Sequence, residues 1–451
     1  MHEIPRGARE KAILVGVMTQ GQPRADLDDS LTELADLADT AGADVVGRLT
    51  QTLTHVNAAT YLGSGKVNEL KEQVEQHEVQ LVIFDDDLSP KQLRNLESSI
   101  GCKLIDRSGI ILDIFATRAK SATAKTQVEL AQLDYLRTRL TRQWTHLSRQ
   151  NGGIGTKGPG ETQIETDRRL IGARIAVLRE KLKAIDRQRT TQRKGRSEYT
   201  RFALVGYTNA GKSTLMNALS HANVLAEDRL FATLDATTRL VHLDANKQVM
   251  LSDTVGFIRK LPHKLIESFK STLDETRESD ILLHVIDAAH PRFEDHMGVV
   301  QETLRELGAH EKKVLLVFNK VDALEERGLL AALQAQFPDA AFVSALRGAG
   351  LDALRARMIA LSEVDFVERE AILPLAEGAA IAHLRRVAEV LSEEYLFAVP
   401  TAREAWREQD APVPQAAVRL RLRLAPQHAR DAEPVLARYR HLVAVPEPAA
   451  A

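Results

Sequence analysis

Eight consecutive residues of this chain have the spacing of a phosphate-binding loop, G-x-x-x-x-G-K-[ST]. They are Gly206, Tyr207, Thr208, Asn209, Ala210, Gly211, Lys212 and Ser213. The loop follows an apolar run at 202–205 and precedes a helix-like run that starts at Thr214. Glycines at both ends let backbone N–H groups point into one concavity, where phosphates can bind. Lys212 would reach the β- and γ-phosphates and Ser213 would bind Mg²⁺; the alternative is a chance glycine-rich turn.

A second motif follows the strand-like run 248–252. It consists of Asp253, Thr254, Val255 and Gly256. The Asp253 carboxylate can hold Mg²⁺ through water, and the Gly256 N–H can meet the γ-phosphate. In Ras-like switches the next residue is a glutamine that orients the attacking water, but here it is Phe257. A phenyl ring cannot take this role, so we expect slow intrinsic hydrolysis, with the water positioned by backbone groups or by a partner.

A third motif concerns the base. The apolar run 314–318, typical of a buried parallel strand, leads into Asn319, Lys320, Val321 and Asp322. The Asp322 carboxylate can accept hydrogen bonds from N1–H and the exocyclic amino group of guanine, whereas adenine would leave this charge unpaired. Backbone N–H groups after the run 341–343 can meet the guanine O6; they belong to Ser344, Ala345 and Leu346. The three motifs predict a GTP-binding domain and conflict with an ATP-dependent kinase or ATPase at this core.

The segment 231–239, here called the switch loop, lies between the first two motifs. Its first residues, expected at the nucleotide, are Phe231, Ala232, Thr233 and Leu234. We assign to Thr233 a hydroxyl ligand to Mg²⁺ and a backbone N–H to the γ-phosphate; Thr237 and Thr238 are the alternatives. A segment held only by the γ-phosphate and Mg²⁺ would be released on hydrolysis.

The residues expected to support catalysis are Asn209, Lys212, Thr233 and Gly256. The amide oxygen of Asn209, beside the phosphates, could ligate K⁺ in place of an arginine finger. The alternative is that Asn209 only holds its own loop. The expected cofactor is therefore Mg²⁺, with K⁺ as a candidate second ion.

Residues 118–197 form a basic block, here called the basic hairpin. Between 118 and 196 there are 19 Lys or Arg against 7 Asp or Glu. Two sets of apolar residues recur at three- and four-residue steps, which predicts two helices packed as an antiparallel coiled coil. The sets are Leu133, Leu136, Leu140, Trp144 and Leu147, and Ile164, Ile171, Ile175, Leu178, Leu182 and Ile185.

The connection between these two helices is rich in glycine and basic residues. A mobile, basic tip on a rigid arm suits insertion into structured RNA, whose phosphates and 2′-hydroxyls it can contact. The expected RNA contacts are Arg149, Asn151, Gly152, Gly153, Thr156 and Lys157. The alternatives are a flexible hairpin loop and a merely solvated basic helical face.

Strand-like and helical runs alternate ahead of the hairpin, which predicts a small parallel α/β domain. The strands are 12–17, 44–49, 80–84 and 103–105, and the helices include 28–41 and 64–76. The segment 63–66 could bind a phosphate or be an ordinary helix start, and the acidic cluster 85–87 could bind a ligand or be solvated. After the GTPase core, 379–395 is predicted to be helical. A strand at 418–424 places three arginines on one face, either for RNA or on the exposed face of a half-buried sheet.

Composition indicates a multi-domain chain of 451 residues, 44% of them hydrophobic. We expect an α/β domain at 1–117, the basic hairpin at 118–197, a parallel-sheet P-loop GTPase domain at 198–362, and a small α+β domain with a disordered tail at 363–451. The single Cys102 excludes an internal disulfide framework and indicates a reducing compartment. Without an apolar signal core or membrane-span run, the chain is expected to be a cytoplasmic monomer.

Several of these segments together resemble HflX-type GTPases. They are 61–66, 152–169, 206–213, 231–239 and 253–257; Ala236 departs from the family's expected proline. The resemblance implies that GTP hydrolysis is coupled to the large ribosomal subunit and its RNA, in splitting or rescue of stalled ribosomes, with the hairpin tip near the peptidyl-transferase region. It also allows a second, adenine-tolerant nucleotide site in the N-terminal domain, which could give a secondary ATPase activity. The alternative is a protein-binding signalling switch without ribosome contact.

Overall fold

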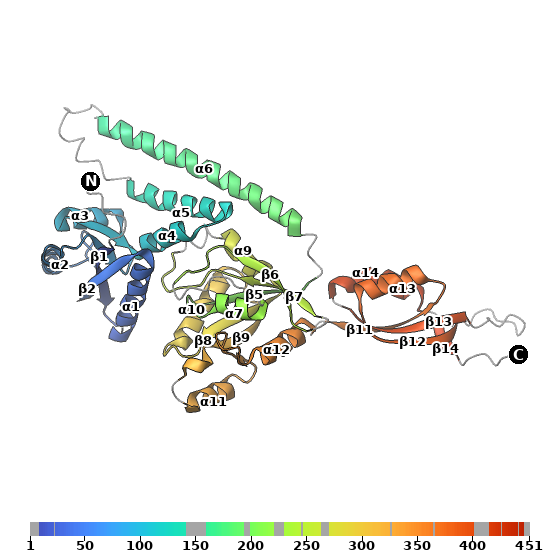
Figure 1. Cartoon of the computed structure of the whole chain (residues 1–451). Helices are drawn as coiled ribbons and strands as arrows, with labels where there is room; N and C mark the ends of the chain where they lie inside the picture. Colours follow the sequence, from blue (N-terminus) through green and yellow to red (C-terminus); the bar gives the residue numbers. More distant parts are fainter. Residues whose placement is uncertain are drawn as a thin grey trace, which may run out of the picture. The chain divides into compact units, whose positions relative to one another are not determined.

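The computed structural model describes residues 9–21, 23–140, 159–193, 199–220, 230–244, 247–262, 270–324, 327–363, 366–400, 415–424, 426–440 and 442–445. The chain divides into two compact units, Met1–Arg355 and Ala356–Ala451. Figure 1 shows the elements of each unit. Among the described helices, none combines the length and the apolar character needed to cross a bilayer.

The first unit begins with a four-stranded parallel sheet of order β2-β1-β3-β4. Its strands are β1 (Glu10–Thr19), β2 (Ala43–Leu53), β3 (Leu81–Phe84) and β4 (Lys103–Asp106), and its helices are α1 (Arg24–Ala41), α2 (Ser64–His77), α3 (Pro90–Ile100) and α4 (Arg107–Arg118). Alternate β1 residues face opposite sides, so Ile13 and Val15 pack under α2 and α3, while Ala12 and Leu14 pack under α1 and α4. The predicted N-terminal α/β domain is confirmed.

The predicted antiparallel hairpin is present as α5 (Ala122–Leu140) and α6 (Pro159–Arg193), which run in opposite directions in Figure 1. Its seam consists of Leu130, Leu133, Ile171, Ile175, Leu178 and Leu182. The assignment of Leu136 to this seam is wrong, because its side chain is 46% exposed. A step of six residues from Leu130 turns Leu136 away from the packed face. With 35 residues, α6 is roughly 50 Å long.

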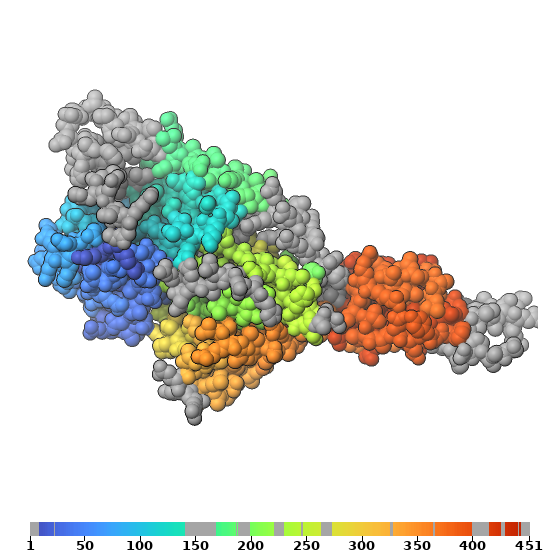
Figure 2. Space-filling view, viewed as in Figure 1, coloured from blue at the N-terminus to red at the C-terminus, as the bar shows by residue number. Residues whose placement is uncertain are grey.

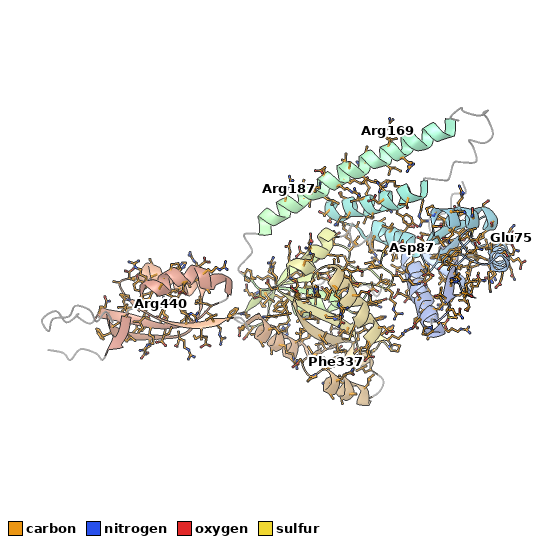
Figure 3. The ribbon with its side chains drawn as sticks, turned by 180° about the vertical axis from the view of Figure 1, so that it is seen from behind. Glu75, Asp87, Arg169, Arg187, Phe337 and Arg440 are labelled. Atoms are coloured by element: carbon orange, nitrogen blue, oxygen red, sulfur yellow. The ribbon has the colours of Figure 1, made fainter. Side chains whose placement is uncertain are left out.

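The described surface of α6 is basic. Its exposed cations are Arg168, Arg169, Arg174, Arg179, Lys181, Lys183 and Arg187. Figure 3 shows Arg169 and Arg187 toward opposite ends of this helix, and Figure 2 shows α5 and α6 on the outside of the first unit. Two ion pairs join the helices, Arg174 to Glu129 at 2.7 Å and Arg179 to Asp134 at 3.4 Å. Lys183 also pairs with Glu180 at 2.8 Å within α6, so carboxylates partly neutralise this basic surface.

The remainder of the first unit contains a six-stranded sheet of order β10-β9-β8-β5-β7-β6, in which only β6 is antiparallel to its neighbour. The strands are β5 (Arg201–Gly206), β6 (Thr237–His242), β7 (Gln248–Asp253), β8 (Ile281–Asp287), β9 (Lys313–Asn319) and β10 (Ala341–Phe342). The helices are α7 (Lys212–Ser220), α9 (Lys270–Glu278), α10 (Phe293–Glu306), η2 (Val321–Ala323), α11 (Arg327–Gln336) and α12 (Leu351–Glu363), the last continuing past the unit boundary. Because β5, β7 and β9 are parallel, their carboxyl ends lie at one edge of the sheet, where the predicted motifs begin.

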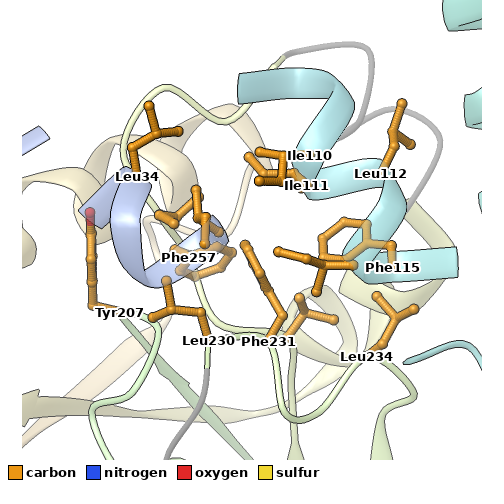
Figure 4. Close-up of a cluster of buried hydrophobic side chains, with 14 of the residues drawn as sticks. Leu34, Ile110, Ile111, Leu112, Phe115, Tyr207, Leu230, Phe231, Leu234 and Phe257 are labelled. Atoms are coloured by element: carbon orange, nitrogen blue, oxygen red, sulfur yellow. The ribbon is translucent and has the colours of Figure 1, made fainter. Parts of the chain in front are cut away.

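One apolar cluster joins the two sheets of the first unit. Figure 4 shows Ile111 and Phe115 of α4 facing Phe231 and Leu234 of the switch loop, with Phe257 close by. The Phe115 and Phe231 rings meet edge to face with centroids 4.8 Å apart. The switch loop therefore has contacts beyond those that a nucleotide would provide.

The second unit contains an antiparallel sheet of order β11-β13-β12-β14. The elements are β11 (Val367–Pro374), α13 (Gly378–Val387), β12 (Glu389–Pro400), β13 (Gln415–Leu424), α14 (Pro426–Arg438) and β14 (Leu442–Val445). The predicted helix 379–395 is half wrong, because its second half forms β12. Residues such as Tyr395, which pairs with Val418, gain a strand partner that local sequence cannot reveal.

The arginine face of β13 forms a ladder of ion pairs. Arg419 lies 2.7 Å from Glu394, and Arg421 lies 2.9 Å from Glu368. The apolar residues between them are buried, including Leu420 and Leu422. The exposed face of a half-buried sheet, stabilised by cross-strand charge pairs, explains these arginines without RNA.

Candidate functional site

The loop 206–213 connects β5 to α7, and its glycines are required by close approaches. A Cβ on Gly206, where φ is 155°, would lie 2.2 Å from the Val285 carbonyl oxygen. A Cβ on Gly211, where φ is 87°, would lie 2.3 Å from Asn319 Nδ2. Any other residue at these positions would push the loop off the strand ends that hold it.

Lys212 is buried inside this loop. Its Nζ donates hydrogen bonds to the carbonyl oxygens of Gly206 at 3.1 Å and Tyr207 at 2.7 Å. Burial lowers the pKa of Lys212 to about 8, although the nearby Asp253 carboxylate acts in the opposite direction. Burial, with the positive charge of Lys212, also lowers the pKa of His284 on β8 to about 4. The site therefore holds a cation that is short of negative partners.

The three residues expected to bind Mg²⁺ converge. Ser213 Oγ donates to Asp253 Oδ2 at 2.6 Å and lies 2.7 Å from Thr233 Oγ1, which itself lies 3.1 Å from Asp253 Oδ2. Burial raises the pKa of Asp253, while the Ser213 hydrogen bond and Lys212 oppose this effect. The other oxygen, Asp253 Oδ1, is buried without a hydrogen-bond partner among the described residues. An orphaned carboxylate oxygen beside two hydroxyls fits a hydrated Mg²⁺.

Thr237 and Thr238, the alternative ligands, lie on β6. The hydroxyl of Thr238 is 2.8 Å from that of Ser252, on the neighbouring strand β7. Of the three threonines, Thr233 thus has the hydroxyl that contacts both Ser213 and Asp253.

A pocket lies over this cluster. Its lining residues are Thr208, Asn209, Gly211, Lys212, Ser213, Thr214, Phe231, Ala232, Thr233, Thr254 and Gly256. Leu234 and Val255, also expected at the nucleotide, have side chains in the apolar cluster. The exposed Asn209 has φ of 59°, and no hydrogen bond joins its side chain to another described residue.

Gly256 and Phe257 hold the following loop against the phosphate loop. A Cβ on Gly256 would lie 2.9 Å from Thr208 Cα and 3.0 Å from Lys212 Nζ. The N–H of Phe257 donates to Gly206, and the N–H of Thr208 donates to Phe257 at 2.8 Å. The Phe257 ring is 1% exposed within the apolar cluster, so this residue serves packing.

The base motif is placed beside the phosphate loop by Asn319. Its Nδ2 donates to the Ala210 carbonyl at 3.0 Å, and its Oδ1 accepts the Ala345 N–H at 3.0 Å. The Ser344 N–H donates to the Ala349 carbonyl, also at 3.0 Å. Leu346, two residues after Ser344, is 80% exposed. The two Asn319 bonds tie both halves of the base motif to the loop 206–213.

Asp322 and Lys320 complete this edge. A hydrogen bond from Ser344, with a further contribution from Arg347, lowers the pKa of Asp322, so its carboxylate is ionised. Lys320 pairs with Asp287 at 2.8 Å, and its φ is 60°. Val321 begins the short helix η2, which carries Asp322.

Sequence reasoning missed a polar network that connects the phosphate loop to α1 and α4. The Tyr207 hydroxyl bonds to Glu33 and accepts the N–H of Arg259 at 2.9 Å. Arg107, only 1% exposed, pairs with Glu33 and with Asp85. The partners are up to 174 residues apart in sequence, so no local spacing could have indicated them.

The expected RNA contacts lie outside the described residues. They are Arg149, Asn151, Gly152, Gly153, Thr156 and Lys157.

Asp322→Asn should change base preference. The amide replaces one acceptor with a donor, so the affinity for GTP should fall by roughly 10- to 100-fold while that for xanthosine triphosphate rises. Fluorescence titration of both nucleotides checks this, with Asp339→Asn as the control because this exposed carboxylate lies beyond α11. Unchanged GTP affinity would remove Asp322 from the site.

Nucleotide affinity should fall at alkaline pH. A bound phosphate raises the pKa of Lys212 from its value of about 8, so binding takes up a proton above that pH. Between about pH 8 and pH 9 the dissociation constant for GDP should rise by up to ~10-fold. Titration calorimetry in buffers of different ionisation enthalpy measures the proton uptake. Lys212→Met should bind weakly and without this pH dependence; equal behaviour of both proteins would contradict the assignment.

Three segments of the chain match families of GTPases. Residues 28–116 match the family described as GTP-binding GTPase N-terminal, 118–196 match GTP-binding GTPase Middle Region, and 201–320 match 50S ribosome-binding GTPase. A solved GTP-binding protein from the archaeon Sulfolobus solfataricus, in complex with GDP, is 24% identical, with a TM-score of 0.42, over 78% of this chain and 98% of that one.

Two relatives cover most of the chain. The GTPase HflX of Flavobacterium psychrophilum is 53% identical over 314 residues, which are 70% of this chain and 76% of that protein. The GTPase HflX of Escherichia coli is 44% identical over 375 residues, which are 82% of this chain and 87% of that protein. The resemblance inferred from the motifs is confirmed: the chain belongs to the HflX family of GTPases and is a GTP-hydrolysing enzyme.

Proposed function

We propose that this GTPase acts on the large ribosomal subunit and splits or rescues stalled ribosomes. The observation that carries the proposal is the joining of a GTPase core and a basic helical hairpin in one compact unit. The match of residues 201–320 to a family described as 50S ribosome-binding GTPase supports the same partner. The protein is proposed to act as a monomer in the cytoplasm.

The nucleotide site is proposed to bind GTP and GDP through the phosphate loop, the switch loop and the base motif. Lys212 supplies positive charge to the β- and γ-phosphates, and the Gly256 N–H donates to the γ-phosphate. Asp322 selects guanine. Bound Mg²⁺, held by Ser213, Thr233 and Asp253, would neutralise phosphate charge.

Hydrolysis is proposed to be slow until the ribosome is engaged. Phe257 is buried in the apolar cluster and offers no group that could orient a water molecule. Asn209, whose side chain is exposed at the phosphate loop, is proposed to ligate K⁺. The remaining catalytic geometry would come from backbone groups or from the partner surface.

The basic hairpin is proposed to carry the protein onto ribosomal RNA. The exposed cations of α6 would contact phosphates. The tip, with Arg149, Asn151, Gly152, Gly153, Thr156 and Lys157, would enter the peptidyl-transferase region.

Potassium should stimulate hydrolysis by the free protein. If Asn209 ligates K⁺, turnover should rise by about tenfold when K⁺ replaces Na⁺ at constant ionic strength, because a cation stabilises charge that develops on the phosphates. Phosphate release is measured in both salts, with Asn209→Ala as the comparison. Equal turnover in the two salts would exclude the cation.

Replacing residues 152–160 by a short neutral turn should separate GTPase activity from ribosome activity. Hydrolysis by the free protein should be retained, because the phosphate loop begins at Gly206. Nucleotide-dependent co-sedimentation with ribosomes, ribosome-stimulated hydrolysis and subunit splitting should collapse. Substituting Arg149 and Lys157 alone should weaken binding and lower its salt dependence by about one log–log unit per lost phosphate contact. A tip-replaced protein that splits ribosomes as the parent does would leave the hairpin as a spacer.

A further inference from the structure

The switch loop is anchored to the base of the basic hairpin by one carboxylate. Asp235 Oδ2 accepts the backbone N–H groups of Lys120 and Ser121, both at 3.0 Å, and its Oδ1 accepts the Ser121 hydroxyl. Residues 120 and 121 directly precede α5, the first helix of the hairpin. These bonds therefore connect the GTPase domain to an element more than 100 residues away in sequence.

Ser121 is built into the start of α5. Its hydroxyl oxygen accepts the Ala124 N–H at 3.0 Å, and its carbonyl accepts the Lys125 N–H at 3.0 Å. Ser121 thus caps the helix and donates its own hydroxyl proton to Asp235. A carboxylate at the N-terminus of a helix also interacts favourably with the helix dipole. Position and charge therefore both favour Asp235 at this point.

Asp235 lies two residues after Thr233. The apolar side chain between them, Leu234, is 2% exposed and packs in the cluster with α4. On the other side, Phe231 has φ of 55°, a strained value for a phenylalanine, and its ring packs on Phe115. Thr233 is thus held from both sides, and its hydroxyl contacts Ser213 and Asp253.

We propose that Asp235 and Ser121 are positioning residues for GTP hydrolysis, which hold Thr233 over the phosphate site and couple that site to the hairpin. The inference rests on the proposed assignment of Thr233 to Mg²⁺ and the γ-phosphate. Because α5 and the switch loop share these bonds, displacement of the hairpin base displaces Thr233. By reciprocity, a γ-phosphate that holds Thr233 stabilises the first turn of α5.

The coupling predicts an effect that depends on the γ-phosphate. GDP has no γ-phosphate for Thr233 to meet, so loss of the anchor should leave GDP affinity unchanged. Asp235→Asn and Ser121→Ala should each lower the affinity for a non-hydrolysable GTP analogue by about tenfold, the equivalent of one charge-assisted hydrogen bond. The turnover number should fall by roughly 10- to 100-fold, as expected when a reacting constellation is displaced.

The test measures GDP affinity, GTP-analogue affinity and turnover on the full chain. Ser121→Thr, which keeps the hydroxyl and the cap, should retain the parent values, and Asp339→Asn is the exposed carboxylate control. If the two anchor residues act through one contact, the Asp235→Asn and Ser121→Ala effects should be non-additive in the double variant. Thermal unfolding of each variant identifies any loss of folding, which would lower GDP and analogue affinity together.

Hydrogen exchange gives a second readout. The amides of Lys120 and Ser121 should exchange more slowly with the GTP analogue than with GDP, and this difference should disappear in Thr233→Ala. If Thr233→Ala weakens analogue binding but Asp235→Asn and Ser121→Ala do not, the positioning role is overturned while the phosphate-site assignment stands. Unchanged analogue affinity in Thr233→Ala would overturn the Thr233 assignment, and the inference with it.

Discussion

The nucleotide site depends on two buried side chains of opposite charge, Lys212 and Asp253, which do not fully neutralise each other. Lys212 is held by two backbone carbonyls, and Asp253 leaves one carboxylate oxygen without a partner among the described residues. Buried charges are costly unless they are paired or coordinate an ion. Phosphate and the proposed Mg²⁺ would supply the missing partners, because the strand ends hold both groups at the same place. The parallel order of β5, β7 and β9 brings these groups to one edge.

Residues of the N-terminal sheet, of α4 and of the hairpin base pack in one apolar cluster with the loops of the GTPase domain. Phe257 occupies the position of a water-orienting glutamine, and the structure shows that its ring instead fills a cluster with Ile111 and Leu34. The switch loop, expected to depend on ligands alone, also packs through Phe231 on α4. The switch loop and the loop that contains Phe257 therefore contribute both to the phosphate site and to the apolar cluster. A movement of the hairpin base would act on groups close to the phosphates.

Local patterns predicted most elements because their causes are local. Alternating burial along β1 and the continuous apolar run of β9 follow directly from side-chain periodicity. Two expectations about these elements were wrong, and both errors have non-local causes. Residues 389–395 were expected in a helix but gain antiparallel partners on β13, and Leu136 was expected in a seam whose true members are set by the facing helix α6.

The sequence by itself determined the order of the phosphate, γ-phosphate and guanine motifs, since each motif is a short run whose spacing dictates its chemistry. It also determined the charge of the hairpin and the glycine at positions 206, 211 and 256. Only the tertiary structure decided that Thr233 rather than Thr238 meets Ser213, that Tyr207 reaches Glu33, and that Asp235 binds the start of α5. The Tyr207 and Asp235 contacts join segments more than 100 residues apart, and the Thr233 contact distinguishes one of several equivalent threonines. Such contacts depend on how separate elements pack and not on the spacing of residues along the chain.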